Sequence, residues 1–556
     1  MLINVLFYEY FKKNYIRILS FVIIISLINP LQSVVLSRLY GKLFDIMHQN
    51  KKFPSFFEFK NILKGNMAGI MMVICIVYII IFLLYMSKNY LETIIVPDYF
   101  KYVRTLLFSN FIKKYSNDYK DVKTGEVLSK IFELNMAVIY LFINLSNYFL
   151  ATIVGLIAIT CYYLYLDINI GFIFLVAVCG VLLLYYFNAH KQIDNSIQKL
   201  NILYKNNEDI NDRLSNLLNI YINNEQNNEI NKFIKNEFVF KRQFVKNYWI
   251  EKKLVTTADI IIVSSAILIL IVSYYSYKNK RIDTVGLISI IVTLGIGLDY
   301  LFQLNGEVSN SIYQFGIIKS NESLLNEILD LKKRDIKEVT LITGKIEFKN
   351  VVFGYDNKKI LKNFNYTIKN KEKVAIMGRS GSGKTTIMKL LIDLHEINSG
   401  EILVDGVNIK NIDTNYLREK IIYINQKTVL FNRTIIENMK YGTDKNDKDV
   451  YDLLNKYELM VIFNKLPNSI KTNSGVNGNN LSMGMQKIVM LVRGILKDGI
   501  IYIFDEPLTS LDSKTRNKVI NMLMGELKDK TLLVITHDKE ILPHMTKLLQ
   551  MNNITN

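Results

Sequence analysis

Six long apolar runs, separated by stretches rich in Lys and Arg, occupy the first part of the chain. At a rise of about 1.5 Å per residue, helices of this length cross a hydrocarbon core about 30 Å thick. We therefore predict an all-α transmembrane domain at residues 1–330. Its predicted spans are about 16–37, 66–86, 145–165, 168–188, 260–277 and 284–304.

Two charged stretches, Ser87–Met136 and Ala189–Asp259, join the second span to the third and the fourth to the fifth. We predict them to be helices that extend into the cytosol, which places both chain termini there. Basic residues in loops predicted to be external, such as Lys278 and Arg281, weaken an orientation drawn from charge alone. The alternative is that these stretches are solvated helices and nothing more.

The hydrophobic period changes after a charged linker predicted at 331–340. Residues alternate as in strands, first at Ile346–Val351 and then at Val352–Tyr355. Short apolar runs follow, with helical stretches between several of them, which predicts an α/β domain at 341–556. These runs are Val374–Met377, Ile421–Ile424, Ile500–Phe504 and Leu532–Ile535.

Half of the 556 residues are hydrophobic and 21% are charged, which suits membrane spans joined to a water-soluble domain. The net charge of +18 is compatible with nucleic acid binding, but basic residues also collect at the cytoplasmic face of membranes. We favour the lipid bilayer as partner over nucleic acid. The three cysteines lie in apolar runs and indicate neither disulfides nor a metal site, and no secretory signal is evident.

A Gly-x-x-x-x-Gly-Lys-Thr loop lies between the predicted strand Val374–Met377 and a helical run from Thr386. Such a loop directs backbone N–H groups into one concavity, the helix adds its positive N-terminus, Lys384 reaches the outer phosphates and Thr385 can ligate Mg²⁺. The sequence therefore predicts a site for ATP and Mg²⁺. The predicted nucleotide-binding residues here are Gly378, Arg379, Ser380, Gly381, Ser382, Gly383, Lys384, Thr385 and Thr386.

The apolar strand before Asp505 and Glu506 delivers two adjacent carboxylates. Asp505 is predicted to hold Mg²⁺, and Glu506 to polarise the attacking water, because phosphoryl transfer mainly requires positioning and neutralisation of developing charge. Together with the loop, this pair resembles the ABC transporter ATPase family.

Other motifs of that family occur in order. The resemblance implies that Tyr355 stacks on adenine, Gln426 reports on Mg²⁺ and the γ-phosphate, and His537 acts as the switch histidine. Residues 509–512 match the loop that crosses the dimer, and Ser482 with Gly484 would face the nucleotide of the opposite subunit. Catalytic roles are thus expected for Glu506, His537 and Gln426, and metal contacts for Thr385, Gln426 and Asp505.

Six spans with long intracellular extensions resemble the exporter type of this family, and Lys123–Leu128 resembles its first cytoplasmic loop. A second coupling segment is expected at Leu217–Ile230. The resemblance implies a half-transporter that dimerises with a second subunit and exports a substrate by alternating access. The substrate cannot be read from these motifs.

Three positions depart from the family pattern. Met483 and Met485 replace a glycine and the glutamine of the signature, and Val476 stands where exporters usually have a glutamate. The family's last helix is also expected to be absent. An intact Glu506 beside a degenerate signature predicts one member of a heterodimer rather than a homodimer.

Other functions remain open at this point. An ATP-gated channel or a regulatory subunit would use the same fold, whereas fusion of both domains in one chain argues against an importer. Asp259 and Asp299, near the cytosolic ends of the last two spans, suit either a cationic substrate or simple interfacial solvation, and we favour solvation.

Overall fold

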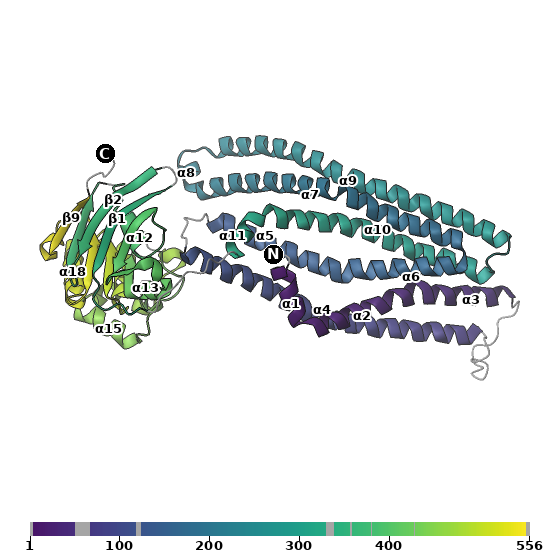
Figure 1. Cartoon of the computed structure of the whole chain (residues 1–556), viewed down its shortest axis with the longest axis horizontal. Helices are drawn as coiled ribbons and strands as arrows, with labels where there is room; N and C mark the ends of the chain where they lie inside the picture. Colours follow the sequence, from purple (N-terminus) through teal and green to yellow (C-terminus); the bar gives the residue numbers. More distant parts are fainter. Residues whose placement is uncertain are drawn as a thin grey trace. The chain divides into compact units, whose positions relative to one another are not determined.

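The protein is described here by a computed structural model that covers residues 4–49, 67–117, 124–329, 339–355, 358–379, 381–426 and 429–551. The chain divides at residue 330 into two compact units (Figure 1). The exception is a short segment at the end of α4, which is grouped with the second unit. Most of the predicted linker, and the start of the predicted coupling loop at Lys123, lie outside the described residues.

The first unit is built of helices, six of which are long and apolar enough to cross a membrane in the described part of the chain. Each predicted span lies within one of these, except that Asn66 falls outside the described residues. The helices are α1 (Glu9–Lys13), α2 (Tyr15–Pro30), α3 (Leu36–Gln49), α4 (Met67–Asn117), α5 (Thr124–Ile143), α6 (Leu150–Leu166), α7 (Ile168–Ser215), α8 (Leu217–Ile222), α9 (Gln226–Lys278), α10 (Thr284–Ser320) and α11 (Glu322–Leu329).

Short polar residues and a proline set the ends of several of these helices. Asp167 caps α7 by accepting the backbone N–H of Asn169, and Asp283 caps α10 in the same way through Gly286. Pro30, which lacks an N–H, ends α2, and a π-helical turn (Leu31–Val35) leads into α3 without breaking the rod.

The helices α7, α9 and α10 run side by side (Figure 1). The ammonium of Lys199, on α7, makes a 2.8 Å ion pair with Glu251 on α9. The same ammonium lies 5.3 Å from the ring centre of Tyr313 on α10. Because this buried ammonium pairs with Glu251 and lies near the ring of Tyr313, it links α7, α9 and α10.

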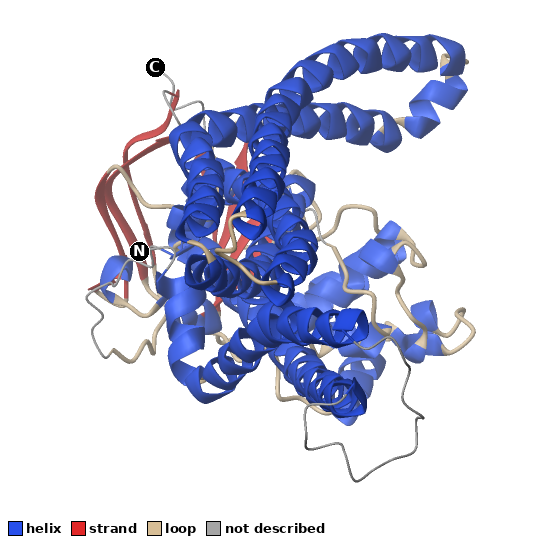
Figure 2. Cartoon of the chain, turned by 90° about the vertical axis from the view of Figure 1, so that its right-hand side faces the viewer, coloured by secondary structure: helices blue, strands red, loops and turns tan. Residues whose placement is uncertain are grey.

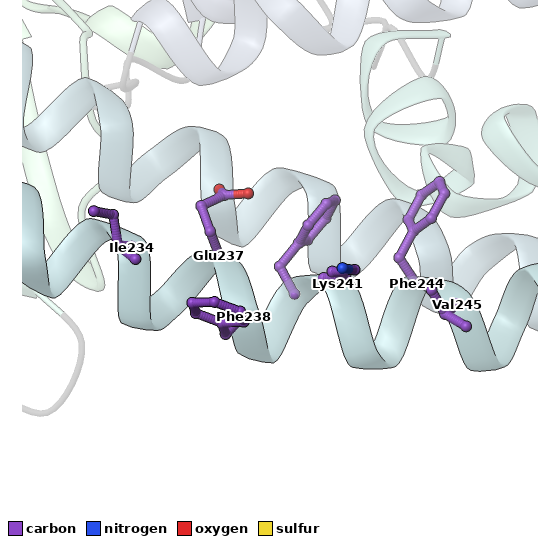
Figure 3. Close-up of a pocket in the computed structure, with 7 residues that line it drawn as sticks. Ile234, Glu237, Phe238, Lys241, Phe244 and Val245 are labelled. Carbon is purple, nitrogen blue, oxygen red and sulfur yellow. The ribbon is translucent and has the colours of Figure 1, made fainter.

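An open groove of about 400 Å³ lies along the outer part of α9, where mostly apolar side chains project in successive turns (Figure 3). The helix α8, which lies within the expected second coupling segment, carries side chains that are exposed or half-buried. The lining residues of the groove are Ile234, Glu237, Phe238, Phe240, Lys241, Phe244 and Val245.

The second unit contains all the described strands, in two sheets (Figure 2). A four-stranded antiparallel sheet has the order β2-β1-β4-β5, and a five-stranded parallel sheet has the order β6-β7-β8-β3-β9. The strands are β1 (Ile346–Tyr355), β2 (Lys358–Ile368), β3 (Lys373–Gly378), β4 (Ser399–Val404), β5 (Val407–Asn408), β6 (Ile421–Ile424), β7 (Ile501–Asp505), β8 (Thr531–Ile535) and β9 (Lys547–Met551).

One hydrophobic core is shared by the two sheets and the helix that follows β3, and a second core packs on helices of the α17 and α18 region. The helices of this unit are α12 (Lys384–Leu391), α13 (Thr414–Lys420), α14 (Ile435–Met439), α15 (Asp447–Lys456), α16 (Met460–Phe463), α17 (Met483–Ile495) and α18 (Ser513–Glu526). Apolar strands such as β7 and β8 are buried along their whole length, as expected for strands covered on both faces.

The predicted α/β class is confirmed, but some strand assignments were wrong or incomplete. The two strands predicted between Ile346 and Tyr355 form one strand, β1, bent by register irregularities near Asn350, which has a φ of +49°. The strands β2, β4, β5 and β9 were not predicted. Leu532–Ile535 is therefore not the last strand, because β9 pairs with β3 at the sheet edge.

The carboxylate of Asp405 holds the chain where it enters the second unit. It accepts the backbone N–H groups of Ile342 and Thr343, both at 2.8 Å, and of Lys345 at 2.9 Å, and it also accepts the Thr343 hydroxyl. Partial burial would raise the pKa of Asp405, but these hydrogen bonds outweigh it, so the net pKa is lowered.

We expect Asp405→Ala to lower the free energy of unfolding by about 2 kcal/mol, because three backbone donors lose a charged acceptor. Since the folded-state pKa is depressed, this stabilisation is present above the unfolded-state value and is lost as the pH falls through the folded-state value. Thermal unfolding of the full chain measures both effects. The control is Asp529→Ala, which breaks an exposed pair with Lys371 and should leave the unfolding temperature close to that of the wild type.

Candidate functional site

The phosphate-type loop leaves the carboxyl end of β3, which lies between β8 and β9 in the parallel sheet. Its path requires glycine at two positions. A Cβ on Gly378 would lie 2.4 Å from the carbonyl oxygen of Met551, and Gly383, which precedes α12, has a φ of +92°. The backbone therefore enters the helix through a left-handed turn that L side chains disfavour.

The predicted loop residues share this turn but differ in exposure. Lys384 is buried, and its ammonium donates to the carbonyl oxygens of Gly378 at 2.7 Å and Arg379 at 2.9 Å. Gly381 has a φ of +80°, Arg379 is exposed, and Thr386 is buried in α12. Ser380 lies outside the described residues.

The buried hydroxyl of Ser382 has no hydrogen-bond partner among the described residues. An unsatisfied buried polar atom in a loop of this shape is a position where a ligand oxygen would be received. The backbone concavity, the Lys384 ammonium and this hydroxyl form a donor set that fits the phosphates of a nucleotide.

Asp505 meets this loop because β7 and β3 flank the same strand, β8, in parallel. Ile535 of β8 pairs with Asp505 on one side and with Ile376 on the other, so the three strands end at one edge. The hydroxyl of Thr385 donates to the carboxylate of Asp505 at 3.0 Å. These adjacent oxygens are the ligand type that Mg²⁺ prefers.

Burial raises the pKa of Asp505, and the hydrogen bond from Thr385 with the charges of Lys487 and Lys384 partly opposes this rise. Among the described residues, no group of three or more His, Cys, Asp and Glu side chains could hold a metal ion. A Mg²⁺ ion at Asp505 and Thr385 would therefore complete its coordination with phosphate oxygens and water, as is usual for this ion.

Glu506 follows Asp505 in a left-handed conformation, with a φ of +51°, and its N–H donates to the carbonyl oxygen of Ile535 at 2.8 Å. This kink turns the Glu506 side chain away from the strand direction. One of its oxygens lies 3.8 Å from Nε2 of His537, whose side chain is 59% exposed. The structure thus brings Glu506 and His537 together.

Other predicted residues lie in the same unit at varied exposure. Gln426 is exposed just after β6, and its carbonyl oxygen accepts a hydrogen bond from Lys487 at 3.3 Å. Tyr355, at the end of β1, meets the ring of His395 edge-on, with centroids 5.3 Å apart. Tyr355 is 39% exposed.

The signature segment forms the start of α17. Ser482 caps the helix by accepting the N–H of Met485 at 3.3 Å. A Cβ on Gly484 would lie 3.0 Å from the carbonyl oxygen of Ser510, so this glycine allows the loop at 509–512 to pack closely. Met483 is 66% exposed, and it projects where the family has a glycine.

Sequence analysis missed two residues of this site. Gln486 donates to the carbonyl oxygens of Gly478 at 2.9 Å and Leu481 at 3.2 Å, and so shapes the loop before α17. Lys487 is buried beside Asp505 and Glu506, and burial lowers its pKa while these carboxylates oppose the shift. The feature of the sequence that could have indicated Lys487 is its position directly before the apolar run at 488–492.

The family model described as ABC transporter matches residues 361–509, which include the loop, Gln426, the signature segment and the two carboxylates. The chain thus resembles ABC transporters over residues 361–509. Its second unit is an ABC-type ATPase domain, and the chain is a multi-pass integral membrane protein with six candidate spans in its described part.

Relatives and a solved structure agree with this assignment. The chain is 31% identical over 276 residues to "Iron-sulfur clusters transporter ATM1, mitochondrial" of Debaryomyces hansenii, which covers 49% of this chain and 40% of that protein. It is 34% identical over 234 residues to "ATP-dependent lipid A-core flippase" of Syntrophus aciditrophicus, covering 41% and 39%. The matched segment thus spans less than half the length of these curated relatives.

The fold is similar over nearly the whole chain to "Structure of a bacterial Atm1-family ABC exporter with ATP bound". The TM-score is 0.82 at 19% identity, with 97% of this chain and 93% of the other covered. The exporter-type architecture predicted from the sequence is therefore confirmed as a fold.

We expect Gly383→Ala to weaken ATP binding by tenfold or more, roughly the effect of 1–2 kcal/mol of strain placed in the loop. The new Cβ would also lie 2.9 Å from Ile360. Gly406→Ala is the matched control, because Gly406 has a similar φ of +81° and a Cβ added there would meet no atom within 4 Å. Binding of a fluorescent ATP analogue would be measured, and equal losses in both variants would contradict a role for the loop.

Proposed function

We propose that the chain is an ATP-driven exporter subunit whose ATPase domain powers alternating access of the helical unit. The observation that carries the proposal is the meeting of the glycine-rich loop and Asp505, with a 3.0 Å hydrogen bond from Thr385, in a chain that also supplies six candidate spans. In this proposal the nucleotide and Mg²⁺ lie on the cytosolic side, and the cargo crosses the bilayer through the helices.

The proposed roles follow from position and chemistry. The loop 378–386 and Ser382 bind the phosphates, Tyr355 stacks on adenine, and Thr385, Asp505 and Gln426 hold Mg²⁺. Glu506 orients and polarises the attacking water, and His537 beside it contacts the γ-phosphate. Bound Mg²⁺ would supply charge neutralisation at the phosphates during transfer.

We further propose that the working unit is a dimer, in which Ser482 and Gly484 of one subunit close over the nucleotide held by the other. A heterodimer is favoured because Met483 and Met485 alter the signature while Glu506 is intact. In a heterodimer, this Glu506 would work against the partner's signature, and the altered signature would close over the partner's site.

The identity of the cargo does not follow from these observations. The two relatives are named for different cargoes, iron–sulfur clusters and lipid A core, and the matched segment covers only part of each. A cation site at Asp259 is not favoured, because its carboxylate accepts a hydrogen bond from the Asn305 amide at 2.7 Å within the helical unit. A cation site at Asp299 is not favoured either, because this residue is exposed. A channel or regulatory subunit remains the second candidate.

We expect Glu506→Gln to lower kcat for ATP hydrolysis by about 100-fold or more while ATP binding persists, because the variant keeps the shape but loses the base. Glu540→Gln, an exposed carboxylate paired with Arg516, is the control and should retain normal turnover. Phosphate release and ATP binding would be measured on purified protein in lipid. Undiminished turnover in the Glu506 variant would contradict the proposed role.

Measurements of oligomeric state and of transport test the rest of the proposal. The chain purified alone should show little transport-coupled turnover, and co-expression with its natural partner should restore it. If the single chain forms a dimer with brisk, Glu506-dependent and transport-coupled hydrolysis, the heterodimer proposal is wrong. Uphill, ATP-dependent uptake into inverted vesicles would support export, whereas passive flux upon ATP binding would favour the channel.

A further inference from the structure

Lys487 is a buried charge that the reaction scheme above does not use. Its side chain is 7% exposed in the second turn of α17. Lysine is rarely buried to this extent, because removing an ammonium from water is costly unless polar groups replace the lost hydration. The groups that surround Lys487 therefore indicate what its buried charge does.

The ammonium of Lys487 has partners from two segments of the nucleotide site. It donates to the backbone carbonyl oxygen of Gln426 at 3.3 Å, and its charged neighbours are Asp505 and Glu506. The Gln426 contact is to the main chain, so Lys487 holds the path of that segment and leaves the glutamine side chain available. One positive charge thus contacts the main chain at Gln426 and acts electrostatically on Asp505 and Glu506.

The helix that carries Lys487 begins at the signature. Ser482 caps α17, and Gly484 packs close to Ser510 in the loop at 509–512. Five residues separate Ser482 from Lys487, about 7.5 Å along a helix axis. A displacement of the start of α17 must therefore move the lysine as well, because a helix of 13 residues shifts as a rigid rod over this distance.

We propose that Lys487 is a positioning residue that couples the signature helix to the Gln426 segment and the carboxylates of the same subunit. The inference rests on the proposed function, in which the signature serves the opposite nucleotide. Closure over one nucleotide would then act, through α17 and the Lys487 ammonium, on the geometry of the other site.

The experiment compares charge with bulk at this position. Lys487→Met keeps the length of the side chain and removes the charge, whereas Lys487→Arg keeps the charge. Lys373→Met is the matched control, because Lys373 is also buried in this domain but donates to the carbonyl oxygens of Leu527, Lys528 and Lys530, away from the nucleotide site.

We expect Lys487→Met to lower kcat about tenfold with KM for ATP unchanged, the size expected from one charged hydrogen bond. Its Tm should stay within about 2 °C of the wild type, because methionine suits a buried position. Lys487→Arg should restore most of the turnover. Lys373→Met should lower Tm and leave kcat unchanged within about twofold.

Hydrogen exchange of the peptide that contains Gln426 gives a readout that needs neither nucleotide nor turnover. It should be faster in Lys487→Met and close to wild type in Lys487→Arg. Wild-type exchange and kcat in Lys487→Met would overturn the inference, and so would parallel losses of Tm and kcat that arginine fails to rescue. An inactive wild-type complex would instead refute the proposed function, and the exchange data would still decide the role of Lys487.

Discussion

The hydrogen bond from Thr385 to Asp505 is the contact on which the nucleotide site depends. Its two residues are 120 positions apart and reach each other only because β3 and β7 pair in parallel with β8 and end at one edge. The hydrophobic core beneath this edge fixes the register, since a slip of one residue would turn every side chain of a strand to the opposite face. The loop glycines, the buried Lys384 and the kinked Glu506 are all placed relative to that edge.

The two units use polar groups in different ways. In the helical unit, buried polar contacts such as Lys199 with Glu251 and Asp259 with Asn305 join neighbouring helices, where apolar packing alone gives little specificity. In the ATPase unit, buried charges gather beneath a single edge, where Asp505, Lys384 and Lys487 offset one another's burial. The polar contacts between helices favour a rigid helical unit. The clustered charges of the ATPase unit favour a site whose charges respond to a bound polyanion.

The fold is shared with a solved exporter at 19% identity, while the chemistry that gives this chain its individuality lies in a few side chains. The exposed Met483 and the buried Lys487 stand four residues apart on α17. Substitutions at such positions leave the packing of the helix intact, so a fold comparison alone does not report them.

The sequence alone determined the number of apolar runs, the α/β pattern, the glycine-rich loop and the carboxylate pair, because each depends on residues that are close in the chain. It did not predict β2 or β9, whose strands mix lysine and amide side chains with apolar residues and form only when pairing partners are in place. It also did not single out Lys487, since a lysine in a helix is normally solvated. Only the tertiary structure decided its burial, by packing α17 against β6 and so enclosing a charge that the local pattern would have left in water.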